Sequence, residues 1–146
     1  MPVPAFNLYP DFNVIRVSHT ELVVTDLAAS RAFYVDTLGL QVSAEDSEMI
    51  CLRAMEERGH HCLILRKGND PCCSYLAFRV YSEDDVDKAA AHFSGKGMAT
   101  EWVDRPFQGR TLRVLDPHGI PLEFYFEMTR LPTCLLYTSP SPRDPT

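Results

Sequence analysis

The stretch LRAME at residues 52–56 recurs at residues 112–116 as LRVLD, an offset of 60 residues. Gly59 and Gly119 keep the same offset, so six positions agree on one register. Agreement over so many positions is not expected by chance. The chain therefore contains an internal repeat, and a repeat has to be found first because missing it leads to the wrong fold.

The repeat extends toward the N-terminus of both copies. The segment ELVV at residues 21–24 corresponds to AFRV at residues 77–80, at an offset of 56 residues. The pair Gly39-Leu40 corresponds to Gly97-Met98, at an offset of 58 residues. Small insertions in loops produce such changes of offset, so we expect two copies of one structural unit within residues 15–127.

Each copy begins with a strand that is followed by a helix. Residues 14–24 and 74–81 are rich in β-branched residues and alternate in part between apolar and polar, which predicts strands. In the first copy, Thr25 or Asp26 can cap a helix, and Gly39 supplies the left-handed residue that ends it. Apolar residues at helical spacing lie between these two ends.

The second copy repeats this order. Ser82 is a suitable N-cap, and the acidic residues 83–85 suit the positive end of a helix. Gly95 or Gly97 then ends the helix. Three more strands complete each copy, and we place them at residues 40–45, 48–55 and 60–66, and at residues 98–104, 111–115 and 120–126.

The predicted fold class is therefore α+β, with two tandem βαβββ modules at about residues 15–67 and 73–127. Gly59 and the segment Asp116–Gly119 are expected to form hairpin turns, because glycine offers a positive φ and proline presets its own φ. Two curved sheets of this kind can pack edge to edge and leave a concave face that holds a ligand.

The composition of the chain narrows the classes of partner. The chain has 146 residues, 45% of them hydrophobic, and a formal net charge of -6. An acidic chain has no broad basic field for nucleic acid or an anionic membrane, so neither is expected as a partner. No apolar run is long enough to span a bilayer, and no signal peptide is evident, so we expect a cytoplasmic protein. The five cysteines are expected to be reduced.

The two ends of the chain differ from the middle. Residues 1–13 hold three prolines and are expected to form an irregular N-terminal arm, ahead of a domain at residues 14–130. Residues 131–146 are expected to form an irregular tail. Its segment CLLYTSPSPRD, residues 134–144, looks like a translated sequencing adapter that replaces a missing catalytic domain. The alternative is a natural proline-rich linker to a second domain.

The paired βαβββ pattern resembles the vicinal-oxygen-chelate superfamily, whose metal ligands come from the first and fourth strands of each module. The repeat places His19, Leu63, Tyr75 and Glu123 at these positions. Iron-dependent oxygenation needs two imidazoles and one carboxylate, so only His19 and Glu123 are candidate metal ligands here. His60 and His61 are interpreted as polar residues of a hairpin turn.

Both candidate ligands also have a structural interpretation. His19 can be a partly buried histidine whose hydrogen bonds are satisfied. Glu123 precedes Phe124-Tyr125-Phe126, and a carboxylate in an apolar strand is costly unless it meets a cation, a donor or a metal. An ion-paired remnant of a former metal site is therefore the alternative for Glu123. No catalytic residue is assigned.

A closer resemblance rests on the segments HTELVVTDLAASRAFYVDTLGL at residues 19–40, EERGHH at 56–61 and LEF at 122–124. They are similar to the N-terminal domain of the homoprotocatechuate (3,4-dihydroxyphenylacetate) 2,3-dioxygenases, extradiol enzymes of aromatic catabolism. The resemblance implies a scaffold domain without cofactor, with His19 and Glu123 as vestigial positions. It places Fe(II), or Mn(II), and the catecholic substrate in a C-terminal catalytic domain of a homo-oligomeric parent.

Two other functions remain open at this point. One is a stand-alone dimeric glyoxalase-like metalloenzyme, in which His19 and Glu123 join ligands from a partner chain. The other is a metal-free protein that binds a small molecule in an aromatic-lined cup. The first predicts stoichiometric metal in the purified chain, and the second predicts ligand affinity that chelators do not change.

Overall fold

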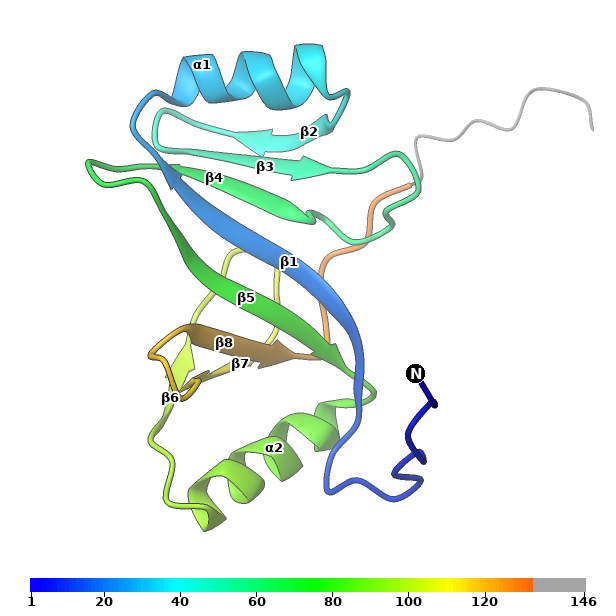
Figure 1. The fold of residues 1–146 in the computed structure, drawn as a ribbon. Helices are drawn as coiled ribbons and strands as arrows, with labels where there is room; N and C mark the ends of the chain where they lie inside the picture. Colours follow the sequence, from blue (N-terminus) through cyan, green and yellow to red (C-terminus); the bar gives the residue numbers. More distant parts are fainter. Residues whose placement is uncertain (133–146) are drawn as a thin grey trace, which may run out of the picture.

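Residues 1–132 are described by a computed structural model in which eight strands form one mixed sheet (Figure 1). The order of the strands across the sheet is β2-β3-β4-β1-β5-β8-β7-β6. The first module contains β1 (Val14–Val24), α1 (Leu27–Arg31), η1 (Ala32–Thr37), β2 (Gln41–Glu45), β3 (Met49–Arg53) and β4 (Leu63–Lys67). The second contains β5 (Cys72–Val80), α2 (Glu83–Gly95), β6 (Thr100–Val103), β7 (Thr111–Leu115) and β8 (Pro121–Tyr125).

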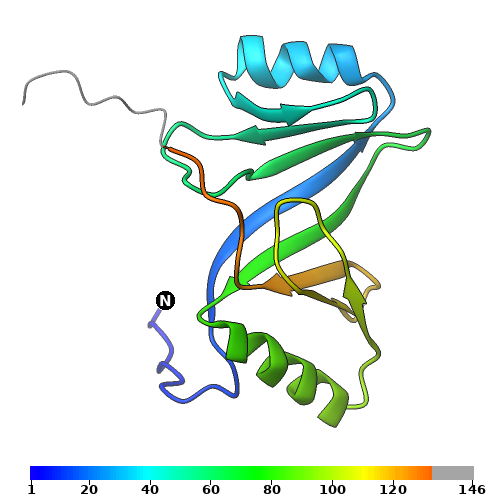
Figure 2. The ribbon, with the colours of Figure 1, turned by 180° about the vertical axis from the view of Figure 1, so that it is seen from behind.

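The two modules have the same topology and meet at their first strands. β1 pairs in parallel with β4, and β5 pairs in parallel with β8. β1 and β5 run antiparallel along the middle of the sheet and join the two halves, as both ribbon views show (Figures 1 and 2). The predicted α+β class with two tandem βαβββ modules is therefore confirmed.

Each helix covers the outer face of its own half of the sheet. Leu52, Leu63 and Leu65 form a buried cluster to which Leu27 and Tyr34 of the first helical segment add. A second cluster joins α2 to the other half through Val86 and Ala89, with Val80, Leu112, Val114 and Phe124 from the strands. The face away from both helices is called the inner face below, and it carries the candidate site.

The first helix is less regular than the sequence predicts. Asp26 is the cap, since its side chain accepts a hydrogen bond of 2.9 Å from the Ala29 amide. After Arg31 the chain continues as a π-helical segment in which the Leu38 amide bonds to the Phe33 carbonyl. Gly39 has φ +87°, which confirms its predicted role as the left-handed stop.

Two predictions about the turn before β4 were wrong. β4 begins at Leu63 and not at residue 60, and Gly59 has no positive φ. Gly59 forms an isolated bridge with Arg130, so the chain after β8 crosses back to the first module. A Cβ at Gly59 would lie 3.1 Å from the Met128 sulfur. Glycine is needed here for this close approach.

The N-terminal arm, residues 1–13, contains no helix or strand. Its last residues hold it to α2 and β8. Asp11 bonds to His92 at 2.6 Å, and the Phe12 ring packs edge-on against Phe93 and Phe124. The predicted tail lies outside the described residues from residue 133 onward.

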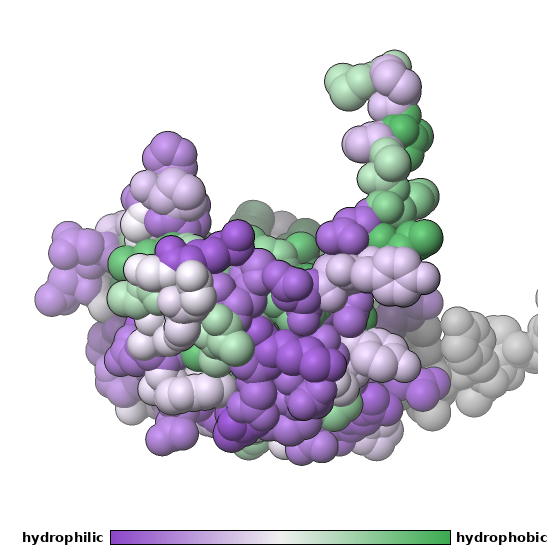
Figure 3. All heavy atoms as spheres, turned by 90° about the horizontal axis from the view of Figure 1, so that it is seen from below, coloured by the Kyte–Doolittle hydropathy of each residue, from purple (hydrophilic) through white to green (hydrophobic). Residues whose placement is uncertain are grey.

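The surface around α2 is mostly hydrophilic, as the view from below shows (Figure 3). The first turn of α2 carries three acidic residues, and Lys88 pairs with Asp84 at 2.7 Å on the exposed side. Within residues 1–132, none of the helices has the length and apolarity needed to cross a membrane.

Replacing Ser82 with alanine should lower the free energy of unfolding by about 1 kcal/mol. The Ser82 hydroxyl accepts from the Asp85 amide at 3.2 Å and donates to the Asp85 carboxylate at 2.6 Å. Urea denaturation of both chains measures the difference. Ser94→Ala, in the exposed last turn of the same helix, is the control and should change stability by less than about 0.5 kcal/mol. Equal values for the two variants would contradict the capping role.

Candidate site on the inner face of the sheet

Strand pairing places His19 and Glu123 in one row of the sheet. His19 of β1 pairs with Ala77 of β5, and Ala77 pairs with Glu123 of β8. Residues directly opposite each other on paired strands project to the same face. The two predicted site residues thus face the same side but are separated by a strand.

Leu63 does not belong to this row, contrary to the prediction. It packs against Leu22 and Leu27 on the outer face, beneath the first helix. Alternation along β4 then directs Ile64 and Arg66 to the inner face. The offset of 60 residues, taken from the hairpin, differs by one residue from the true register, and a slip of one residue moves a side chain to the other face.

His19 is buried, with 2% of its surface exposed, and lies among aromatic rings. Its ring meets the rings of His61, Tyr75 and Tyr125 at centroid distances of 4.6, 5.7 and 5.5 Å. Nδ1 lies 3.1 Å from the Ser18 hydroxyl, while Nε2 has no partner among the described residues. Burial, helped by the charge of Arg105, lowers the pKa of His19 to about 4. The imidazole is therefore neutral at neutral pH.

Glu123 is fully buried and is held by two arginines from neighbouring segments. Arg105 donates to both carboxylate oxygens, at 3.0 and 2.5 Å, and Arg113 donates to one of them at 3.1 and 2.7 Å. The Arg105 guanidinium also lies over the Tyr75 ring, 4.4 Å from its centroid. Of the two interpretations of Glu123, the structure shows the ion-paired one.

A second buried carboxylate on the same face was missed from the sequence. Glu21, two residues after His19 on β1, is 4% exposed and bonds to Arg66 at 3.0 Å. It pairs in register with Tyr75 of β5. Alternation along a strand could have placed Glu21 beside His19. Its arginine partner comes from another strand, so only the tertiary structure shows it.

His60 and His61 are not surface residues of a hairpin turn, as the sequence interpretation had them. They are 3% and 1% exposed, and they precede the strand. Because His61 is outside β4, strand alternation does not restrict its side chain, and its ring reaches His19. The Nδ1 atoms of His60 and His61 are 3.1 Å apart. Burial is the largest cause that lowers the pKa of His61, to about 3.

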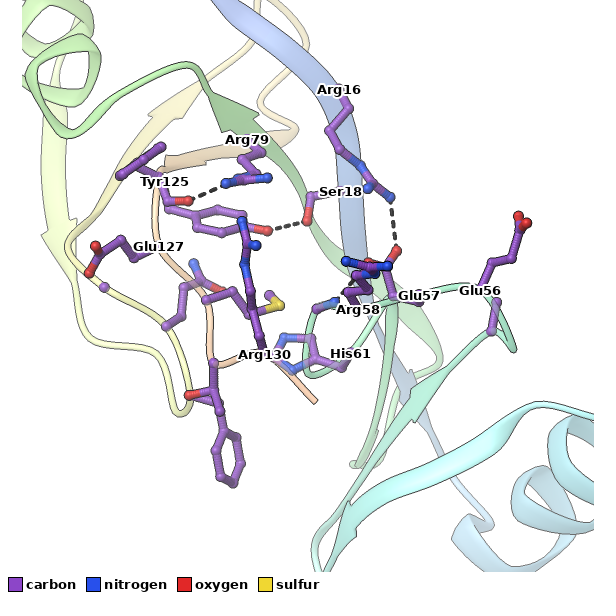
Figure 4. Close-up of a pocket in the computed structure, with 18 residues that line it drawn as sticks. Arg16, Ser18, Glu56, Glu57, Arg58, His61, Arg79, Tyr125, Glu127 and Arg130 are labelled. Atoms are coloured by element: carbon purple, nitrogen blue, oxygen red, sulfur yellow. Dashed lines mark hydrogen bonds and ion pairs between the residues drawn. The ribbon is translucent and has the colours of Figure 1, made fainter. Parts of the chain in front are cut away.

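An open hollow of about 1260 Å³ lies beside this cluster (Figure 4). Its wall is made by residues 54–59, by residues 107–109 and by the segment 126–130, while Ser18, His61 and Tyr125 line it from the sheet. Ser18 and Tyr125 share a hydrogen bond across β1 and β8. The charged lining residues are Arg16, Arg58, Arg79, Arg130, Glu56, Glu57 and Glu127. The lining is thus more charged than the aromatic cup expected from the sequence.

A model of the Glyoxalase/Bleomycin resistance protein/Dioxygenase superfamily matches residues 16–124, which include both modules and the inner-face row. The chain belongs to this superfamily. The match covers the full βαβββ repeat and agrees with the topology of the sheet. Membership brings an expectation of metal at the inner face, so the side chains present there have to be compared with that expectation.

Several curated relatives within the superfamily are dioxygenases. The chain is 28% identical over 120 residues to a manganese-dependent 2,3-dihydroxybiphenyl 1,2-dioxygenase of Geobacillus genomosp. 3, and the match covers 80% of this chain and 38% of that protein. It is 25% identical to a metapyrocatechase of Geobacillus stearothermophilus, with coverages of 94% and 40%. A shorter relative, the uncharacterised protein YaeR of Escherichia coli, is 30% identical and covered over 95% of its length.

Solved structures within the superfamily point the same way. The substrate complex of homoprotocatechuate 2,3-dioxygenase from Brevibacterium fuscum matches with a TM-score of 0.83 and 45% identity, over 88% of this chain and 41% of that chain. The enzyme from Arthrobacter globiformis matches with a TM-score of 0.81 and 39% identity, over 88% and 42%. The chain therefore spans about two fifths of the dioxygenases that it matches.

The inner-face residues do not fit the metal that the superfamily suggests. Both oxygens of Glu123 already accept hydrogen bonds from guanidinium groups, and Leu63 faces the opposite side of the sheet. Tyr75 is buried, and burial raises the pKa of its phenol well above the usual value, so it stays protonated. His19 alone keeps a free lone pair in this row. A mononuclear non-haem site requires three ligands on one face.

Proposed function

We propose that this chain is the non-catalytic N-terminal half of an extradiol dioxygenase of the homoprotocatechuate 2,3-dioxygenase type. In this proposal the C-terminal half of the parent carries Fe(II) or Mn(II) and acts on a catecholic substrate in aromatic meta-cleavage. The parent is a cytoplasmic homo-oligomer. His19 and Glu123 are vestigial ligand positions in the half described here, which contributes folding and contact surface.

One observation carries the proposal, the neutralised carboxylate of Glu123. A metal would have to displace Arg105 and Arg113 from a fully buried group and leave two guanidinium charges without their partner. Breaking a buried ion pair is strongly unfavourable because it leaves an uncompensated charge in a medium of low polarity. The similarity to two-fifths of the dioxygenase structures supports the same assignment.

The proposal can be tested by exchanging halves. Residues 1–130 of this chain replace the matching N-terminal segment of the B. fuscum enzyme, and oxygen uptake is followed with 3,4-dihydroxyphenylacetate. We expect the chimera to consume oxygen. The isolated chain should not consume oxygen after anaerobic loading with Fe(II) or Mn(II), because its inner face lacks the ligand set.

Two controls accompany this exchange. The catalytic half of the B. fuscum enzyme without any N-terminal half should show less oxygen uptake than the chimera if this chain supplies the scaffold. Oxygen uptake by the loaded isolated chain, abolished in a His19→Ala, Glu123→Ala double variant, would instead establish a stand-alone metalloenzyme. An inactive chimera that folds and binds metal would also contradict the scaffold assignment.

The open hollow favours a second candidate, a metal-free protein that binds a small molecule. Its volume of about 1260 Å³ is ample for such a ligand, and YaeR is a relative of similar length. Binding in the hollow that a chelator leaves unchanged, together with an inactive chimera, would support this candidate. Calorimetry with small anionic aromatics, in buffer with and without chelator, is the direct measurement.

A further inference from the structure

Cys51 of β3 lies next to His60 and His61 inside the first module. Cys51 is fully buried, and one ligand atom from each of the three residues lies within 4.8 Å of the others. Pairing of β3 with β4 explains the arrangement. Ile50 and Leu52 face the first helix, so Cys51 between them faces inward, and the Cys62 amide bonds to the Leu52 carbonyl at 2.8 Å and holds the histidines against β3.

The spacing of the two imidazoles is close to that of ligands on one metal ion. Their Nδ1 atoms are 3.1 Å apart, so in the neutral pair one nitrogen donates a proton to the other. In a tetrahedral zinc site with Zn–N bonds of about 2.0–2.1 Å, two nitrogen ligands are about 3.3 Å apart. A cation can replace the shared proton with small movements of the rings.

The cysteine has to approach further. With a Zn–S bond of about 2.3 Å, a sulfur ligand lies about 3.6 Å from each nitrogen ligand. The ligand atoms are now within 4.8 Å, so the remaining shift is about 1 Å, which rotation of the Cys51 and His60 side chains can supply. The binding step releases the thiol proton and the proton shared by the imidazoles, because metal ligands bind deprotonated.

Two further observations point to a ligand at this place. His61 is 1% exposed, yet its Nε2 has no partner among the described residues. A buried polar atom without a partner is unusual and needs an explanation such as an absent ion. The His60 ring stacks on Phe107 at 3.7 Å with an angle of 9° between the planes. Phe107 has φ +64°, a disfavoured conformation that the contact maintains.

We propose that Cys51, His60 and His61 bind one Zn²⁺ ion, or a cation of similar softness, at the wall of the hollow. One thiolate with two imidazoles suits zinc, whereas the carboxylate-rich sites of Mg²⁺ and Ca²⁺ do not resemble this set. Three protein ligands leave one tetrahedral position for water or an anion. The site is distinct from the row that contains His19 and Glu123, and bound metal would hold the β3–β4 loop in place.

Titration of the full chain with Co²⁺ under reducing conditions tests the proposal, because thiolate coordination gives a sulfur-to-cobalt charge-transfer band in the near ultraviolet. We expect the band to saturate at one Co²⁺ per chain and to be displaced by one Zn²⁺. Cys51→Ser should abolish the band and weaken zinc binding by about a hundredfold or more. The matched control is the double variant Cys72→Ser, Cys73→Ser, which removes two exposed neighbouring thiols and should keep the band.

A second measurement needs no variant. Zinc should shift the imidazole nitrogen resonances of His60 and His61 in the wild-type chain and leave those of the exposed turn residue His118 unmoved. The absence of a charge-transfer band would overturn the proposal. A band that persists in Cys51→Ser, or one that disappears in the Cys72, Cys73 control, would also overturn it, since the thiolate would then come from elsewhere.

Discussion

Replacing Glu123 with glutamine should lower the free energy of unfolding by about 3 kcal/mol. Glutamine keeps the shape of the side chain, so the loss reports the charge. The buried carboxylate is the partner of both Arg105 and Arg113, whose side chains are only 17% and 28% exposed. Without it, two guanidinium groups stay in a poorly solvated site with no counter-charge. Urea denaturation at neutral pH measures the difference.

The control is the same substitution in an exposed pair. Glu45 bonds to Arg31 at 2.8 Å with both side chains largely in solvent, so Glu45→Gln should cost less than about 1 kcal/mol. A triple variant, Glu123→Leu, Arg105→Met and Arg113→Met, should recover much of the lost stability because it removes all three charges together. Equal costs for Glu123→Gln and Glu45→Gln would show that the inner-face ion pairs contribute nothing beyond a surface pair.

Lowering the pH from 7.5 to 5 should destabilise the chain by roughly 4 kcal/mol through His19 and His61. Their pKa values are lowered from 6.5 to about 4 and about 3 in the folded state, mainly by burial. Between those values and 6.5, the unfolded chain binds more protons than the folded one, so stability falls as the pH falls. Each histidine contributes about 2 kcal/mol at pH 5.

Urea denaturation across this pH range checks the prediction. His19→Gln should remove about half of the pH dependence, whereas replacing the exposed His118 should leave it as in the wild type. Asp85, whose pKa is lowered in the folded state, contributes stability that is present above 3.8 and is lost only below it, so it falls outside the window. An unchanged slope in His19→Gln would mean that His19 is protonated in the folded chain.

Local rules were sufficient for the order of the elements. The repeat and the alternation of the first strands predicted β1 and β5, and Ser82 and Gly39 are the predicted cap and stop. These features depend on neighbours within a few residues, where sterics and backbone hydrogen bonds decide the conformation. The site was predicted only in part. His19 and Glu123 face inward as expected, whereas Leu63 does not.

The sequence alone determined the duplicated α+β architecture, because the period of apolar residues and the turn chemistry act over short distances and occur twice. Tertiary structure decided which polar groups meet. Arg105 reaches Glu123 from a loop 18 residues away, and His61 turns toward His19 because β4 begins two residues later. Such contacts depend on a strand register of one residue and on where a loop ends, which no local pattern encodes.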